Sequence, residues 1–156
     1  MTTTTIRHQF VETLNALLDE TFEQVRGIYL DRGTSLFETL AGVTAEQASQ
    51  PISASCASIA AQVEHVRFYL EVMQRYIRGE QPGKVDWQAS WQRQVVTPSE
   101  WQARLAELRA AYTSLRELLR GIEAWEGEDE LGGALATVVH TAYHLGEIRQ
   151  AIGVLA

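Results

Sequence analysis

Residues 55–79, SCASIAAQVEHVRFYLEVMQRYIRG, carry the pattern that decides the fold class. Their apolar side chains recur at alternating steps of four and three residues: Ile59, Val63, Val66, Leu70, Met73 and Ile77. This spacing lines them up on one side of an α-helix and is typical of a helix packed in a bundle. Charged and polar residues occupy the opposite face, which we call the charged face: Glu64, Arg67, Glu71, Gln74, Arg75 and Arg78. We therefore expect one long helix from about Ser55 to Gly79.

Three further segments show apolar periodicity of the same helical kind: residues 6–30, 97–122 and 131–155. The segment 97–122 opens with Thr97-Pro98-Ser99-Glu100, a capping box with proline at the first helical position. Short helices are expected at residues 35–40 and after a second capping box, Thr44 to Gln47. Since no segment shows the alternation typical of a strand, the sequence predicts an all-α fold.

The connection between the second and third long helices covers residues 80–97 and is long for a link between neighbouring helices. This length favours a crossover over a tight hairpin. A chain of 156 residues is also long enough to bury the core of one domain. The sequence thus predicts a single four-helix-bundle domain over residues 1–156, with a long crossover between helices two and three.

The composition excludes several classes of partner. Acidic residues outnumber basic ones by 20 to 13, and the formal net charge is −7, so we expect no binding to nucleic acid or to an anionic membrane surface. No apolar run reaches the roughly 18 residues of a membrane span, and no signal peptide is evident, which favours a cytoplasmic protein. The one cysteine, Cys56, excludes an intrachain disulfide. We expect a small buried thiol there rather than an activated one.

The histidines suggest a metal site. His140 and His144 are four residues apart in the segment 131–155, so they lie on one helix face and can share an ion at about 2.0–2.1 Å from each nitrogen. His65 falls inside the apolar arc of the segment 55–79 and points inward. Three neutral imidazoles can hold one divalent ion and leave positions open for water or a substrate. The donor set suits Zn, Ni, Cu and Fe alike.

Other interpretations of these residues stay open. His140 and His144 could be hydrogen-bonded core histidines, and His8, off the apolar stripe, is expected at the surface. Glu147 shares the histidine face and could orient a metal ligand, act as a base, or form an ordinary ion pair. The sequence contains no H-E-x-x-H, G-x-S-x-G, P-loop or dinucleotide fingerprint, which leaves the corresponding enzyme classes without support.

Several short motifs, in this order and spacing, resemble those of the DinB/YfiT-like superfamily of small metal-binding four-helix bundles. They are Ser58-Ile59 with His65 seven residues after the serine, His140-x-x-x-His144 followed by Gly146-Glu147-Ile148, and the lead-in formed by Thr44 to Gln47 and Pro51 to Ser55. The chain departs from the family pattern at Ala57, where an aromatic residue is frequent, and at Glu147, where glutamine is common. Neither departure touches an expected metal ligand.

The resemblance implies a divalent ion, zinc or nickel, on His65, His140 and His144, and a homodimer. It also implies a metal-dependent enzyme acting on a small molecule, either a thiol S-transferase with a low-molecular-weight thiol as cosubstrate or a hydrolase. The loop from Trp87 to Trp91 would help to shape the substrate site. The alternatives are a non-catalytic metal-binding module in stress response or protein interaction, and a plain dimeric bundle with core histidines.

Overall fold

A computed structural model describes residues 3–125 and 127–156, and within these ranges every regular element is helical. The elements are α1 (Thr3–Phe22), α2 (Leu36–Leu40), α3 (Ala45–Ser49), α4 (Ile59–Ile77), the 3₁₀ helix η1 (Ala89–Trp91), α5 (Pro98–Arg120) and α6 (Glu128–Leu155). The all-α prediction is confirmed. Among the described residues, no helix combines the length and apolar character that crossing a membrane requires.

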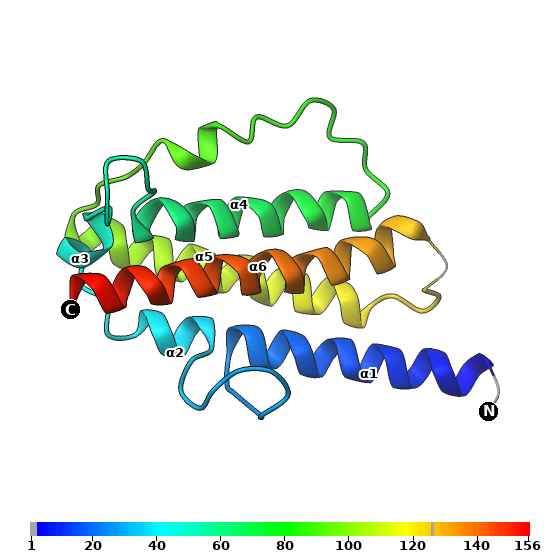
Figure 1. Ribbon diagram of the computed structural model, residues 1–156. Coiled ribbons are helices and arrows are strands. Elements are labelled where there is room, and N and C mark those ends of the chain that lie inside the picture. The colour runs from blue at the N-terminus through cyan, green and yellow to red at the C-terminus, as the bar shows by residue number, and fades with distance from the viewer. Residues whose placement is uncertain (1–2, 126) are drawn as a thin grey trace.

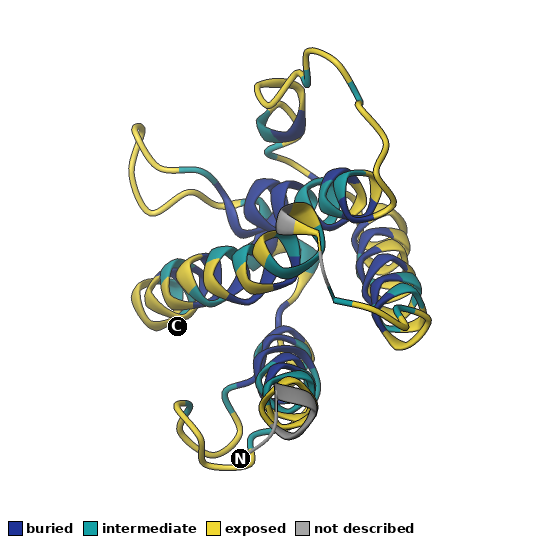
Figure 2. Cartoon of the chain, turned by 90° about the vertical axis from the view of Figure 1, so that its right-hand side faces the viewer, coloured by how far each residue is buried: buried dark blue, intermediate teal, exposed yellow. Residues whose placement is uncertain are grey.

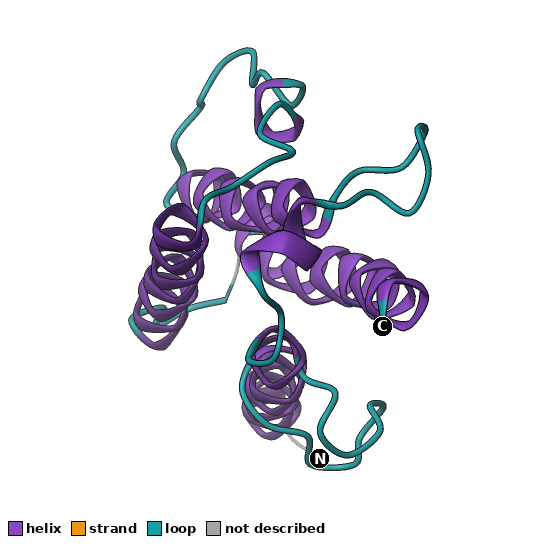
Figure 3. Ribbon diagram, turned by 90° about the vertical axis from the view of Figure 1, so that its left-hand side faces the viewer, coloured by secondary structure: helices purple, strands orange, loops and turns teal. Residues whose placement is uncertain are grey.

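The four long helices, α1, α4, α5 and α6, lie side by side, and α2 and α3 lie toward one end of them (Figure 1). Helix α4 packs against both α5 and α6, and α6 also packs against α1. Buried positions of the long helices face one another (Figure 2). The connection from α4 to α5, which contains η1, runs outside the packed helices (Figure 3). It lies against α4, next to the face that carries His65.

Apolar side chains from all four long helices form one core. Its largest fully buried members are Leu14, Leu18, Phe22, Leu36, Leu40, Ile59, Leu70, Trp101, Leu108, Leu115, Leu145 and Ile148. Phe22 of α1 stacks on Tyr112 of α5 with ring centroids 4.3 Å apart. Trp101 Nε1 donates a hydrogen bond to the Val43 carbonyl at 2.8 Å, so the buried indole is satisfied. The core therefore joins the short helices to the long ones.

Helix α1 ends at Phe22, although the apolar pattern predicted that it continues to residue 30. The cause is Glu20, whose buried carboxylate accepts hydrogen bonds from the backbone N–H of Arg26 and of residues 28–30 at 2.6–2.9 Å. Gly27, with φ of +84°, allows the tight return that this arrangement needs. The prediction of a helix over residues 23–30 was wrong because the Glu20 carboxylate, rather than helical carbonyl groups, accepts the hydrogen bonds of the backbone N–H groups of Arg26 and of residues 28–30.

The capping predictions were confirmed. Thr97 Oγ1 accepts a hydrogen bond from Glu100 N at 3.3 Å, and the Glu100 carboxylate accepts one from Thr97 N at 2.7 Å. Helix α4, however, begins at Ile59 rather than near residue 55, because Ser58 is its N-cap. Ser58 also contacts the connection before α5: its N–H and hydroxyl both donate to Gln94, at 2.7 and 2.6 Å. This contact ties the start of α4 to the segment that carries η1.

Candidate metal centre

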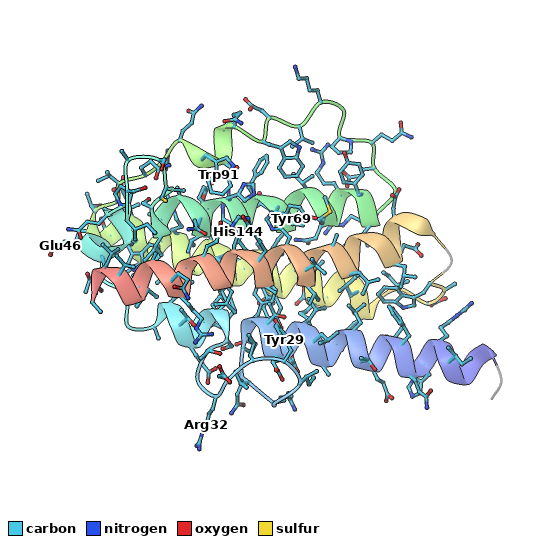
Figure 4. All side chains as sticks on the ribbon, in the orientation of Figure 1. Tyr29, Arg32, Glu46, Tyr69, Trp91 and His144 are labelled. Atoms are coloured by element: carbon cyan, nitrogen blue, oxygen red, sulfur yellow. The ribbon has the colours of Figure 1, made fainter. Side chains whose placement is uncertain are left out.

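The structure brings His65, His140 and His144 together. Helix α4 carries His65, the neighbouring α6 carries the other two, and one ring nitrogen of each lies within 4.8 Å of the others. The Nε2 atoms of His65 and His140 are 3.1 Å apart. His65 and His144 are buried, and His140 is partly buried. Figure 4 labels His144, Tyr69 and Trp91 in the region of α4, α6 and η1. Tyr69 contacts His140, and Trp91 contacts His144.

Ser90 determines which nitrogen of His65 faces the cluster. Its Oγ lies 2.8 Å from His65 Nδ1 and donates its own proton to the Trp87 carbonyl at 2.7 Å. Because a hydroxyl has a single proton, Ser90 must accept from a protonated Nδ1. The Nε2 atom of His65 then carries the lone pair, and it points toward His140.

Glu147 acts in the same way on His144. Its carboxylate oxygen lies 3.0 Å from His144 Nδ1, and Gln62 Oε1 lies 3.4 Å from the same atom. Both neighbours are acceptors, so Nδ1 is the protonated nitrogen and Nε2 is left with its lone pair. A carboxylate behind a histidine in this way is the arrangement that commonly orients metal-binding imidazoles. Of the three roles considered for Glu147, this hydrogen bond supports the one in which Glu147 orients His144.

His140 lacks such a partner. Its Nδ1 is buried and has no hydrogen-bond partner among the described residues, while its ring stacks on Tyr69 with centroids 3.6 Å apart. Two ligand nitrogens on one ion with bonds of about 2.0–2.1 Å are separated by about 2.9 Å in octahedral and about 3.4 Å in tetrahedral geometry. The observed 3.1 Å between His65 and His140 falls within that interval. The donor set and the spacing of this pair therefore fit a divalent metal ion, and the third ring nitrogen lies within 4.8 Å of both.

The electrostatics keep these imidazoles neutral near pH 7. Burial lowers the pKa of His65 to about 4, and the charge that His144 can carry acts in the same direction. Burial, with His144 and His65 nearby, lowers the pKa of His140 to about 3. Burial also lowers the pKa of His144, although Glu147 opposes that shift. Since a metal binds the neutral form of imidazole, the cluster is in its ligating state at neutral pH.

Aromatic side chains cover the cluster. Trp91 stacks on His65 with ring centroids 3.9 Å apart, and Trp87 meets His65 edge-on at 6.3 Å. From the sequence we expected this loop to shape a substrate site, which stays a prediction. Ser90, Gln62 and Tyr69 were not predicted at the cluster. The sequence does contain a signal for Tyr69, because its position lies in the same apolar arc of the helix as His65. No sequence pattern points to Ser90, since its partner His65 lies 25 residues away along the chain.

A cavity of about 550 Å³ adjoins the cluster, and its lining includes Cys56, Gln62, Trp91 and Glu147. Cys56 is exposed, which corrects the expectation of a buried thiol: it lies in the turn before α4, where Ser53 Oγ donates to its sulfur at 3.1 Å. The late start of α4 at Ile59 accounts for that exposure.

His8 is exposed, as expected, and lies on α1 with its Nε2 3.3 Å from a carboxylate oxygen of Glu12. The structure therefore brings together the three histidines that the sequence analysis selected and leaves the fourth apart. Comparisons of the chain with protein-family models, with curated proteins and with solved structures found no match.

Proposed function

We propose that the chain is a DinB/YfiT-like four-helix bundle, with a crossover between α4 and α5, that holds one divalent ion on His65, His140 and His144. The observation that carries this proposal is the fixed orientation of two of the rings. Ser90 and Glu147 occupy Nδ1 of His65 and His144, which leaves both Nε2 atoms available to an ion beside His140. Zinc and nickel are the ions that we favour.

We further propose a metal-dependent enzyme that acts on a small molecule, of the thiol S-transferase or hydrolase type. A bound divalent ion would supply Lewis acidity that lowers the pKa of a water molecule or thiol. The chain itself contributes the surroundings. Glu147 accepts a hydrogen bond from Nδ1 of His144, and Trp91 stacks on His65. Both residues also line the neighbouring cavity. Any low-molecular-weight thiol would come from the cell as a cosubstrate.

One observation favours the alternative of a non-catalytic metal-binding module, in stress response or protein interaction. Among the described residues, the cluster of potential ligands contains the three histidines and no carboxylate, and Glu147 already contacts His144. The enzyme hypothesis therefore requires Glu147 to serve as both orienting group and base, or the substrate to bring its own proton acceptor. Turnover by the metal-loaded protein separates the two functions.

We also propose a homodimer that uses the outer face of α6. Leu135, Val139, Tyr143 and Val154 follow one another along that helix and are 38 to 68% exposed. Such a row of exposed apolar side chains is typical of an interaction surface. Sedimentation of the protein and of Val139→Glu tests it: a dimer that the substitution converts to monomer is expected, and a monomeric parent chain would contradict it.

Elemental analysis tests the metal site. The protein, His144→Ala and the control His8→Ala are purified without chelator and without nickel resin. About one divalent ion per chain is expected in the parent protein and in His8→Ala, and none in His144→Ala. Equal metal content in all three, or no ion in any of them after incubation with zinc and nickel, would overturn the proposal.

A further inference from the structure

The cavity beside His144 has a chemical character of its own. At about 550 Å³ it has the size of a small-molecule site. Gln62 and Glu147 line it, and both contact Nδ1 of His144, so it adjoins the side of the ring away from the three-histidine cluster. Its remaining walls come from the turn before α4, from Trp91 and from the second half of α6.

Glu147 carries the one formal charge among the described residues that line this cavity. A hydrogen bond donated by an imidazole N–H orients that carboxylate but leaves its negative charge in place. No arginine or lysine is present among the lining residues to pair with a carboxylate or phosphate of a ligand. An anionic ligand would therefore meet a like charge without a compensating partner.

Aromatic rings complete the lining. Trp91 and Tyr143 both contribute to the wall, together with the side chains of Cys56 and Gln150. The face of a tryptophan or tyrosine ring attracts an organic cation through its quadrupole. Trp91 is held in place by its stack on His65, so its ring is already ordered before any ligand arrives.

We propose that this cavity binds a small organic cation, an amine or quaternary ammonium group on an apolar body, with the positive charge near Glu147. The net charge of −7 favours the approach of such a ligand. If this ligand is the substrate of the enzyme, that assignment rests on the function proposed above. The binding itself depends on Glu147, Trp91 and Tyr143.

Cys56 offers a direct measurement, because it is the one cysteine of the chain and it lines the cavity. Its alkylation by iodoacetamide, a small neutral reagent, is followed by intact mass. The rate is measured with benzyltrimethylammonium, with benzyl alcohol and with benzoate at matched ionic strength, on the protein as purified and after chelation. We expect the cation to slow alkylation in a saturable manner in both samples, and benzoate to leave the rate unchanged.

The variants test the assignment to Glu147. Glu147→Gln keeps a hydrogen-bond acceptor for His144 but removes the charge, and should weaken protection by the cation about fivefold or more. Glu117→Gln removes an equal charge from the exposed side of α5 and should leave protection unchanged. Tyr143→Leu provides a second variant: it removes the ring but keeps an apolar side chain on the outer face of α6, and it should also weaken protection by the cation.

Protection by benzoate equal to that by the cation would overturn the proposal, as would cation protection that survives Glu147→Gln, or no protection by any probe. Metal content, measured separately on the same samples, reports on the three-histidine site. A protein that binds metal but no cation, or a cation but no metal, thus identifies which of the two proposals has failed.

Discussion

Ser90 Oγ lies 2.8 Å from Nδ1 of His65 and donates its own proton to the Trp87 carbonyl, so a loop hydroxyl fixes the tautomer of a histidine on α4. This relationship gives the connection between α4 and α5 a specific role at the cluster. Trp91, in the same 3₁₀ helix, stacks on the ring of that histidine. The loop therefore fixes both the orientation of His65 and its protonated nitrogen.

Removing the hydroxyl of Ser90 should weaken metal binding. In Ser90→Ala, His65 loses the acceptor that holds Nδ1–H, and we expect affinity for zinc to fall about tenfold or more. Competition with a chromophoric chelator measures this change. Ser114→Ala is a matched control, because it removes a part-buried hydroxyl that donates to Gln74 Oε1 at 2.7 Å, away from the cluster. Equal zinc affinity in Ser90→Ala and Ser114→Ala would show that Ser90 does not orient His65 for metal binding.

Glu147 should affect both the affinity for metal and the protonation of His144. Because the carboxylate raises the pKa of His144 against the effect of burial, Glu147→Gln should lower that pKa further. NMR titration of the metal-free protein measures the shift. Glu147→Ala, which also removes the acceptor, should reduce zinc affinity about tenfold, and Glu147→Gln less. An unchanged His144 titration in Glu147→Gln would contradict the contact seen at 3.0 Å.

The buried histidines predict the acid response of the metal-free protein. The pKa of His65 is lowered to about 4 and that of His140 to about 3, from an ordinary value of 6.5. Between pH 6.5 and these values the unfolded chain binds protons that the folded chain does not. The free energy of unfolding should therefore fall as pH drops from 6.5 toward 3–4.

Urea unfolding at several pH values measures this slope. We expect His65→Gln and His140→Gln each to flatten it, because each removes one imidazole that titrates only after unfolding. His8→Gln, at an exposed position of α1, should leave it unchanged. A slope that persists unaltered in both cluster variants would mean that other groups cause the acid response.

The sequence was most informative where the structural cause is local. The capping boxes at Thr44 and Thr97 depend on hydrogen bonds between residues three apart in the chain. The apolar repeat of residues 59–77 likewise determines which side of that one helix is buried. The convergence of the histidines followed from two such local facts. His140 and His144 share a helix face, and His65 belongs to the apolar arc of a helix that packs on α6.

The features that the sequence did not reveal depend on distant partners. Periodicity placed Gln74 on the charged face of its helix, but it is buried and donates to the Ala111 carbonyl of α5 at 3.1 Å. Ser90 reaches His65 only because of the path of the connecting loop. Nothing in the sequence distinguishes Glu20 from the neighbouring acidic residue Asp19 of α1. Its role depends on a chain that returns six to ten residues later, which no helical pattern encodes.

That role gives the last prediction. The carboxylate of Glu20 accepts hydrogen bonds from the backbone N–H of Arg26 and of residues 28–30, so Glu20→Ala removes the acceptor of four part-buried donors. We expect the free energy of unfolding to fall by about 3 kcal/mol, since hydrogen bonds to a charged group contribute about 1.5–3 kcal/mol each but share one acceptor here. Urea unfolding at pH 7 measures the loss, with the exposed Glu46→Gln as control.

The same group has a distinct dependence on pH. Burial alone would raise the pKa of Glu20, but the N–H donors of Tyr29, Leu30, Ile28 and Arg26 outweigh it and lower the pKa to about 2. A carboxyl group with a lowered pKa stabilises the fold above its ordinary value of 4.5 and loses that contribution as pH falls toward 2. Glu20→Gln should therefore be less stable than the parent at pH 7, yet lose less stability between pH 4.5 and pH 2. If the variant and the parent lose the same amount in that interval, the carboxylate of Glu20 does not stabilise the turn after α1.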